Sequence, residues 1–119
     1  MMTTLISVAL GGAIGSVLRY LVGLTVAFPL GTLTVNVIGS FAIGLIWVHL
    51  ADRGLQHWLP FVMTGLLGGF TTFSAFTLDA LRLVEEGRVT AAGAYVLASL
   101  VASVLACAVG LWIARGMTT

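Results

Sequence analysis

Residues 65–77 read Gly65-Leu66-Leu67-Gly68-Gly69-Phe70-Thr71-Thr72-Phe73-Ser74-Ala75-Phe76-Thr77 and lie within a long apolar stretch of the chain. Glycine pairs and runs of threonine are poor helix formers, so a helix through this stretch is expected to be interrupted. Within a bilayer, an interruption is tolerated only where the freed backbone is buried in protein or lines a cavity. The alternative is a continuous helix in which the glycines only allow close packing. The density of helix-breaking residues favours a break near residues 68–72.

The composition around this stretch is that of an integral membrane protein. The chain has 119 residues, of which 60% are hydrophobic and 8% charged, and its mean hydropathy is +1.16. A soluble domain usually carries about a quarter charged residues, so this chain could not cover its surface in water. The net charge of +1 gives no basic patch for nucleic acid. The single cysteine, Cys107, excludes a disulfide within one chain.

Four apolar stretches are long enough to cross a bilayer, which takes about 20 helical residues. We expect spans at about residues 4–27, 32–51, 59–84 with its break, and 90–114, and interpret residues 1–119 as a single all-α transmembrane domain. The N-terminal residues carry no positive charge and no evident cleavage site follows them, so the first stretch is interpreted as a span rather than a signal peptide. Because the connections are short, function is expected to reside in the helices.

The arginines give these spans no preferred orientation. Arg53 and Arg115 fall at one membrane face, whereas Arg82 and Arg88 fall at the other, with Arg19 near that second face. Orientation normally follows an excess of Lys and Arg on one side. Either a weak bias is resolved by a partner, or the chain inserts both ways and pairs antiparallel with itself. We favour an antiparallel, dual-topology homodimer, because four spans enclose too little space for a pathway.

Small and polar residues recur every four positions along three spans, which places each row on one helix face. The rows are Gly11/Gly15/Arg19/Gly23, Thr32/Asn36/Ser40/Gly44 and Tyr95/Ser99/Ser103/Cys107. Small residues at this spacing let helices approach closely, whereas a polar side chain facing lipid is costly. Arg19 either snorkels to the interface or attracts an anion, and Asn36 either bonds another helix or lines a hydrated path. The serines either bond their own helix or form a row of donors.

Phe73 and Phe76 follow the expected break and are three residues apart. Aromatic residues at helical spacing usually belong to a core. A ring also has a positive edge, and edges turned toward a lumen could solvate a small anion weakly. Backbone carbonyl groups freed by the break could in addition bind a small hard cation such as Na+.

Together these residues resemble the CrcB/Fluc family of fluoride channels, and the resemblance extends through all four spans. It is carried by Gly11-Gly12-x-x-Gly15-x-x-x-Arg19-Tyr20, Gly31-Thr32-x-x-Val35-Asn36-x-x-Gly39-Ser40-Phe41-x-x-Gly44, Gly68-Gly69-Phe70-Thr71-Thr72-Phe73-Ser74-x-Phe76 and the row of Tyr95, Ser99 and Ser103.

The resemblance implies a channel, not an enzyme, that exports fluoride passively across the bacterial plasma or inner membrane and lowers its toxicity. Its partners would be fluoride, a second copy of the chain and membrane lipid, with no nucleic acid. The fluoride pathway implied by the family comprises Asn36, Phe73, Phe76, Ser74, Tyr95, Ser99, Ser103 and Arg19. The backbone carbonyls of Gly68 and Thr71 from both copies would bind a central Na+ that is structural and not transported.

The main alternative is a small dual-topology exporter of drugs or other cations. Proton-coupled export of this kind needs a carboxylate inside the membrane. We place Asp52, Asp79, Glu85 and Glu86 at span ends, which disfavours this alternative. A structural membrane subunit without transport is a further alternative, and it would tolerate changes at Asn36 and at the two phenylalanines.

Overall fold

The computed structural model describes residues 1–117 in full and the backbone of residue 118, and this part of the chain is helical apart from its connections. In chain order the elements are α1 (Met2–Thr25), α2 (Leu30–Asp52), η1 (Gln56–Trp58), η2 (Pro60–Leu67), α3 (Gly68–Phe70), α4 (Phe73–Glu85) and α5 (Val89–Thr118). Within the described residues, the helical spans long and apolar enough to cross a membrane are Met2–Thr25, Leu30–Asp52, Gln56–Glu85 and Val89–Met117. The prediction of an all-helical chain with four such spans is therefore confirmed.

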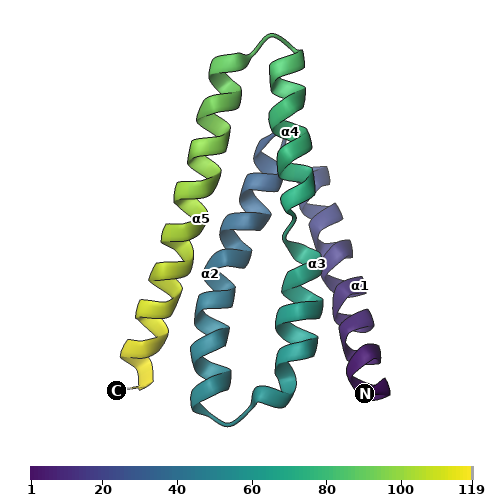
Figure 1. The fold of residues 1–119 in the computed structure, drawn as a ribbon, viewed down its shortest axis with the longest axis vertical. Coiled ribbons are helices and arrows are strands. Elements are labelled where there is room, and N and C mark those ends of the chain that lie inside the picture. Colours follow the sequence, from purple (N-terminus) through teal and green to yellow (C-terminus); the bar gives the residue numbers. More distant parts are fainter. Residues whose placement is uncertain (119) are drawn as a thin grey trace.

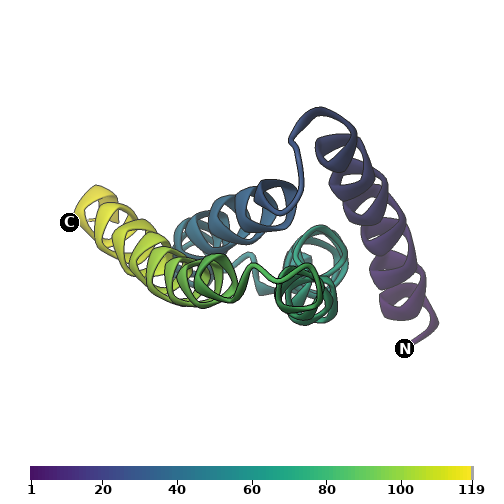
Figure 2. The same cartoon turned by 90° about the horizontal axis from the view of Figure 1, so that it is seen from above.

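The spans are arranged as an open array rather than a closed bundle. The start of α1, the turn between α2 and η1 and the end of α5 lie at one end of the molecule, and the α4–α5 turn lies at the other (Figure 1). Seen from above, α1 and α5 are at opposite sides, with α2 and the third span between them (Figure 2). The most extensive contacts join α2 to α5 and α1 to η2 and α3. The chain is thus built from two tight helix pairs.

Glycines make both helix pairs close. A Cβ placed on Gly65 would lie 2.9 Å from Val8 O, and one on Gly69 would lie 2.6 Å from Gly12 O, so neither position of the third span has room for a side chain against α1. In the other pair, a Cβ on Gly44 would collide with the backbone of α5. Small residues at helix contacts allow this approach in lipid, where packing holds helices together. These contacts fix where the intervening residues lie.

The backbone of the third span changes character along its length. Residues 60–67 are π-helical, and Gly68, Gly69 and Phe70 form one further helical turn. Thr71 (φ −90°, ψ 159°) and Thr72 (φ −156°, ψ 121°) are extended, and α4 begins at the next residue. Gly69 stays helical despite its low propensity because it packs against α1, a tertiary contact that outweighs the local preference.

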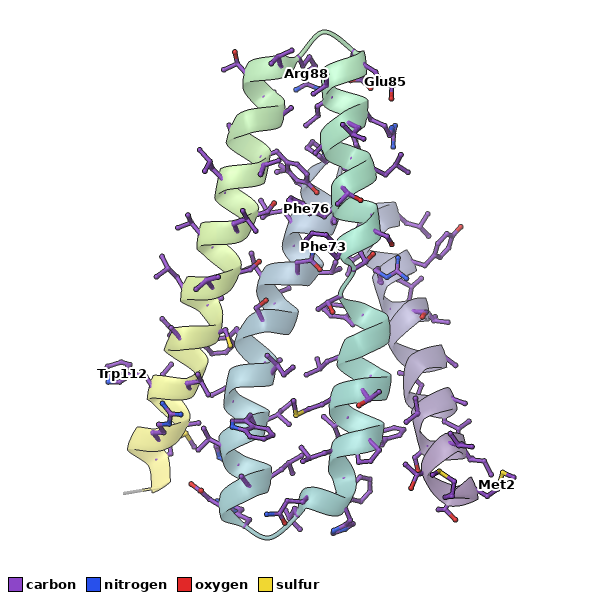
Figure 3. The ribbon with its side chains drawn as sticks, in the orientation of Figure 1. Met2, Phe73, Phe76, Glu85, Arg88 and Trp112 are labelled. Atoms are coloured by element: carbon purple, nitrogen blue, oxygen red, sulfur yellow. The ribbon has the colours of Figure 1, made fainter. Side chains whose placement is uncertain are left out.

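The interior of the single chain is small. Its buried cluster consists of Phe76, Leu83, Ala92 and Tyr95, between α4 and α5. Many large apolar side chains are instead exposed, among them Trp112 and Met2, which point away from the helices (Figure 3). Such an apolar outer surface is the one that a bilayer requires.

Candidate functional site

A cavity of about 350 Å³ lies between α2, the third span and α5. It brings together seven of the ten residues predicted for the site: Asn36, Gly68, Thr71, Phe73, Phe76, Ser99 and Ser103. The remainder of its wall is formed by Gly39, Ser40, Ile43, Met63, Leu67, Thr72, Leu100 and Val104. Among the described residues, none that lines this cavity carries a formal charge. The cavity therefore combines an apolar wall with a few neutral polar groups.

Asn36 pairs with the backbone of Thr72. Its Nδ2 donates a hydrogen bond to Thr72 O at 3.0 Å, and its Oδ1 accepts one from Thr72 N at 2.8 Å. The amide thereby satisfies both backbone groups of an extended residue, and it fixes α2 to the junction of α3 and α4. An amide nitrogen has two hydrogens, so Nδ2 has a second hydrogen besides the one donated to Thr72 O.

Two carbonyl groups of the third span lose their usual helical donors. In a continuous α-helix, Thr72 N–H would donate to Gly68 O and Ala75 N–H to Thr71 O. Here Thr72 N–H donates to Asn36 Oδ1, and Ala75 N–H donates to Thr72 Oγ1 at 3.1 Å. Gly68 and Thr71 both line the cavity, and Gly68 is exposed at its open side. Side chains have thus replaced the backbone as acceptors, which leaves these two oxygens available for a cation.

Phe73 and Phe76 differ sharply in exposure. Their ring centroids are 5.5 Å apart with an interplanar angle of 49°, and both residues lie near the start of α4 (Figure 3). Phe76 is only 7% exposed and packs on Tyr95 at 5.5 Å, whereas Phe73 is 72% exposed. In one chain, Phe76 is therefore a core residue that also faces the cavity, and Phe73 stands at its open edge.

The hydroxyl row on α5 contains an unsatisfied group. Ser99 is 5% exposed, and its Oγ makes no hydrogen bond within the described residues. Ser103 lines the same cavity one turn further along α5. A buried hydroxyl without a partner is unfavourable, because it has lost its hydrogen bonds to water. Ser99 Oγ is thus a candidate donor for a ligand or a water molecule inside the cavity.

Asp79 is a functional candidate that the sequence reasoning missed. The sequence places it with Glu85 at the end of the third span, whereas in the structure it lies within α4, before that helix ends at Glu85, and is 8% exposed. Its Oδ2 accepts hydrogen bonds from Thr32 Oγ1 at 2.6 Å and from Tyr95 OH at 3.4 Å. These hydroxyls stabilise a carboxylate that is buried inside the span. The signal was its spacing, because Asp79 follows Phe76 by three residues on the same helix face.

Arg19, Ser74 and Tyr95 lie outside the first cavity. Arg19 Nε donates to Gly69 O at 3.0 Å, and its side chain lines a second cavity of about 520 Å³ that also touches α2 and Thr72. Ser74 is exposed, and its Oγ is 3.3 Å from Thr72 Oγ1. Tyr95 is buried against Phe76 and connects the hydroxyl row to Asp79.

Comparison with known proteins gives a consistent result over nearly the whole chain. A family model described as "CrcB-like protein, Camphor Resistance (CrcB)" matches residues 6–111. A curated relative from Paracoccus denitrificans is 53% identical over 119 residues, which cover 96% of each chain. A relative from Roseobacter denitrificans is 51% identical, and the match covers 98% of each chain. A relative from Agrobacterium fabrum is 50% identical, and the match covers 92% of this chain and 94% of the relative. All three relatives bear the name "Fluoride-specific ion channel FluC".

Proposed function

The chain belongs to the CrcB-like family, and from this premise we propose that it is a fluoride-selective channel through which fluoride crosses the membrane passively. The relatives that share about half of its residues along almost their full length are named fluoride-specific ion channels, and channels are not enzymes. The observation that carries the proposal is the uncharged cavity containing the unsatisfied hydroxyl of Ser99.

The cavity has the chemistry that fluoride conduction needs. A selective pore must replace the water around an ion with its own groups and still release the ion. Neutral donors at Asn36 Nδ2, Ser99 Oγ and Ser103 Oγ can replace that water, and the positive edges of Phe73 and Phe76 can add weak attraction. A full positive charge in the cavity would bind the anion more tightly and slow its release. A series of weak neutral sites favours transit.

We infer that the working unit is an antiparallel homodimer in which each copy helps to close the pores. A single chain leaves Phe73 largely exposed and Gly68 at the open side of the cavity. A second copy inserted upside down would cover this side and create two equivalent pathways. The balanced placement of Arg53 and Arg115 against the arginines at the opposite end supports insertion in both orientations.

The two freed carbonyls fit a structural Na+ between the copies. Hard cations prefer oxygen ligands, and Gly68 O and Thr71 O are main-chain oxygens without their helical donors. With the same pair contributed by the second copy, four oxygens would surround the ion. When bound, Na+ would supply a fixed positive charge that holds the two copies together. The ion would stay in place while fluoride passes.

The proposed role is the removal of fluoride from bacterial cells. Hydrogen fluoride diffuses into a cell and dissociates there, so fluoride accumulates in the cytoplasm. A passive pathway in the cytoplasmic membrane would let the membrane potential drive the anion out. The relatives compared above are bacterial, which supports this location.

One observation favours the exporter alternative, namely the buried carboxylate of Asp79. A proton-coupled exporter must free its carboxylate for protons and substrate in turn. Asp79 instead accepts hydrogen bonds from Thr32 and Tyr95 and has Arg82 beside it. We therefore infer a fixed role for this carboxylate and retain the channel as the better proposal.

Ion flux from liposomes that contain only this protein tests the proposal. Vesicles loaded with potassium fluoride, in buffer containing Na+, are made permeable to potassium with an ionophore, and released fluoride is measured with an electrode. We expect rapid fluoride efflux without any proton or substrate gradient, and no efflux from matched chloride-loaded vesicles. Fluoride flux no faster than that of fluoride-loaded vesicles without protein overturns the proposal. Flux that requires a counter-transported cation favours the exporter.

A further inference from the structure

The carboxylate of Asp79 lies where an anion leaving the hydroxyl row would meet it. Tyr95, which precedes Ser99 by one helical turn, donates its hydroxyl to Asp79 Oδ2. Asp79 and Thr32 also line a third cavity of about 170 Å³, between the α1–α2 connection and α4. The carboxylate thus stands between the row on α5 and this outer cavity. A negative charge at that point would repel fluoride unless a positive group compensates it.

Arg82 is the group placed to compensate this charge. Its Nη1 is 4.0 Å from Asp79 Oδ1, whereas the hydrogen bonds from Thr32 and Tyr95 go to Oδ2. The two residues are three apart on α4, so they share a helix face. The side chain of Asp79 is 11% exposed and that of Arg82 is 50% exposed, so the pair reaches from the protein interior to its surface.

Phe28 holds the arginine in this position. The guanidinium carbon of Arg82 is 4.2 Å from the centroid of the Phe28 ring, a close cation–π contact. Phe28 lies in the connection between α1 and α2 and lines the same outer cavity as Asp79. A long arginine side chain at a half-exposed site would otherwise sample many rotamers. The ring therefore restricts Arg82 to positions near the carboxylate.

We propose that Arg82, held on the ring of Phe28, is a positioning residue that neutralises Asp79 and so lets anions pass the outer end of the hydroxyl row. This inference rests on the proposed fluoride conduction. It assigns Arg82 a role through Asp79, since Arg82 lines none of the cavities described above. Within the described residues, the polar groups that contact the Asp79 carboxylate are those of Thr32, Tyr95 and Arg82, and Arg82 is the cation among these three.

Arg88 provides a matched control at the same end of the molecule (Figure 3). Its Nη1 is 3.8 Å from Glu86 Oε1, and both of these side chains are about half exposed. Arg82→Gln and Arg88→Gln therefore remove the same charge from the same membrane face, but only the first leaves Asp79 without its cation. A general effect of surface charge would reduce flux equally in both variants.

The test is a mutant cycle in fluoride-loaded liposomes. We expect Arg82→Gln to lower fluoride flux at least about tenfold relative to wild type, since the sign of charge along a narrow path alters ion entry by such factors, whereas Arg88→Gln conducts normally. In the Asp79→Asn background, the same Arg82→Gln change should lower flux less than twofold. Arg82→Lys, which keeps the charge, should recover part of the wild-type flux.

Two results would overturn the inference: equal losses in Arg82→Gln and Arg88→Gln, or a tenfold loss from Arg82→Gln that persists when residue 79 is asparagine. If the Arg82→Gln protein fails to assemble, Phe28→Leu replaces it in the cycle, and its loss must likewise disappear with Asp79→Asn. Wild-type protein that conducts no fluoride would instead reject the proposed function itself, so the two failures are distinguishable.

Discussion

Ser99 differs from the other hydroxyl residues of the spans in being buried without a hydrogen-bond partner among the described residues. Most serines in membrane helices donate to the carbonyl one turn earlier, as Thr34 does to Leu30 O at 2.7 Å. Ser99 Oγ is buried and does not make such a bond within the described residues. A buried hydroxyl without a partner lowers stability, and the proposed function assigns Ser99 Oγ as a donor to the conducted ion.

Replacement of Ser99 by alanine is therefore expected to affect flux and stability in opposite directions. Ser99→Ala should reduce fluoride flux several-fold, because it removes a donor from the cavity. It should leave the free energy of unfolding unchanged or raise it by up to about 1 kcal/mol, because no intramolecular hydrogen bond is lost. Fluoride efflux from liposomes and thermal unfolding in detergent measure the two effects. Thr34→Val is the matched control, with unchanged flux, and a stability loss without a flux loss in Ser99→Ala would contradict the assignment.

Substitutions of Phe73 and Phe76 should both reduce conduction, but only that of Phe76 should also reduce stability. Both Phe73→Ile and Phe76→Ile are expected to reduce fluoride flux strongly, because both remove an aromatic ring from the cavity wall. Phe76 is buried against Tyr95, so its replacement should also cost about 1–3 kcal/mol of stability, whereas Phe73→Ile should leave the stability of the chain nearly unchanged. Flux and unfolding assays on both variants test this, and wild-type flux in either variant would remove that ring from the proposed pathway.

At the residue scale, the sequence predicted polar groups better than it predicted their partners. Asn36 and Ser99 stood out because amides and rows of hydroxyls are unusual within a span. The pairing of Asn36 with the backbone of Thr72 and of Arg19 with Gly69 O joins residues far apart in the chain, which no periodicity encodes. The role of Asp79 is likewise not predictable from the sequence, because its burial depends on hydroxyl groups of Thr32 and Tyr95 on two other helices.

At the scale of elements, the third span contains residues of low helix propensity whose conformation is fixed by contacts with α1 and α2. Glycine and threonine content indicated where a helix would be hardest to continue. The structure keeps Gly68 to Phe70 helical beside α1 and makes Thr71 and Thr72 extended, where Asn36 and the Thr72 hydroxyl accept the backbone N–H groups. The position of the extended residues thus depends on which side chains can replace the helical acceptors, and that depends on the packing of α2.

Gly65 tests whether the close pairing of α1 with η2 stabilises the span. Gly65→Ala would bring a Cβ to 2.9 Å from Val8 O and 3.0 Å from Gly11 Cα, so we expect a loss of about 1–3 kcal/mol. Gly93→Ala is the control, because nothing lies within 4 Å of a Cβ there and alanine is the better helix former. Thermal unfolding in detergent compares the variants. Equal stability of Gly65→Ala and Gly93→Ala would show that the close approach contributes little.

Sodium should stabilise the protein through the backbone of this same element. If Na+ binds the carbonyls of Gly68 and Thr71, a hundredfold excess over its dissociation constant adds about 2.7 kcal/mol to the folded assembly. Replacement of Na+ by N-methyl-D-glucamine should therefore lower the unfolding temperature. Thr71→Val should retain this dependence, because it keeps the carbonyl and alters only a side chain that bonds to Leu67 O. Identical unfolding temperatures in the two salts would reject the cation site.

At the scale of the whole molecule, hydropathy was sufficient to predict the spans but not their arrangement. Each span is apolar over the length needed to cross a bilayer, and this property depends only on the local sequence. The choice of which helices pair closely is not encoded locally, because rows of small residues occur on several spans at once. The pairing of α2 with α5 and of α1 with the third span leaves the uncharged cavity between the two pairs, with one side open.

The open side makes the proposed dual topology the most consequential prediction about the molecule. Glu85 and Gln56 are exposed near the α4–α5 and α2–η1 connections, which lie at opposite ends (Figure 1). In a Cys107→Ala background, single cysteines at Glu85→Cys or Gln56→Cys are treated with a membrane-impermeant thiol reagent in intact bacterial spheroplasts. Insertion in both orientations predicts about half labelling at each site. A single orientation predicts full labelling at one site and none at the other.

Added lysines can test whether fluoride conduction requires both orientations of the chain. Because the arginines are balanced, two added lysines at one end should force a single orientation, and lysines at the other end should force the opposite one. Each biased variant alone should lose fluoride flux, since it cannot form the antiparallel pair, and coexpression of the two should restore it. Full flux from one biased variant expressed alone would mean that parallel or single chains conduct, and the antiparallel dimer would then have to be abandoned.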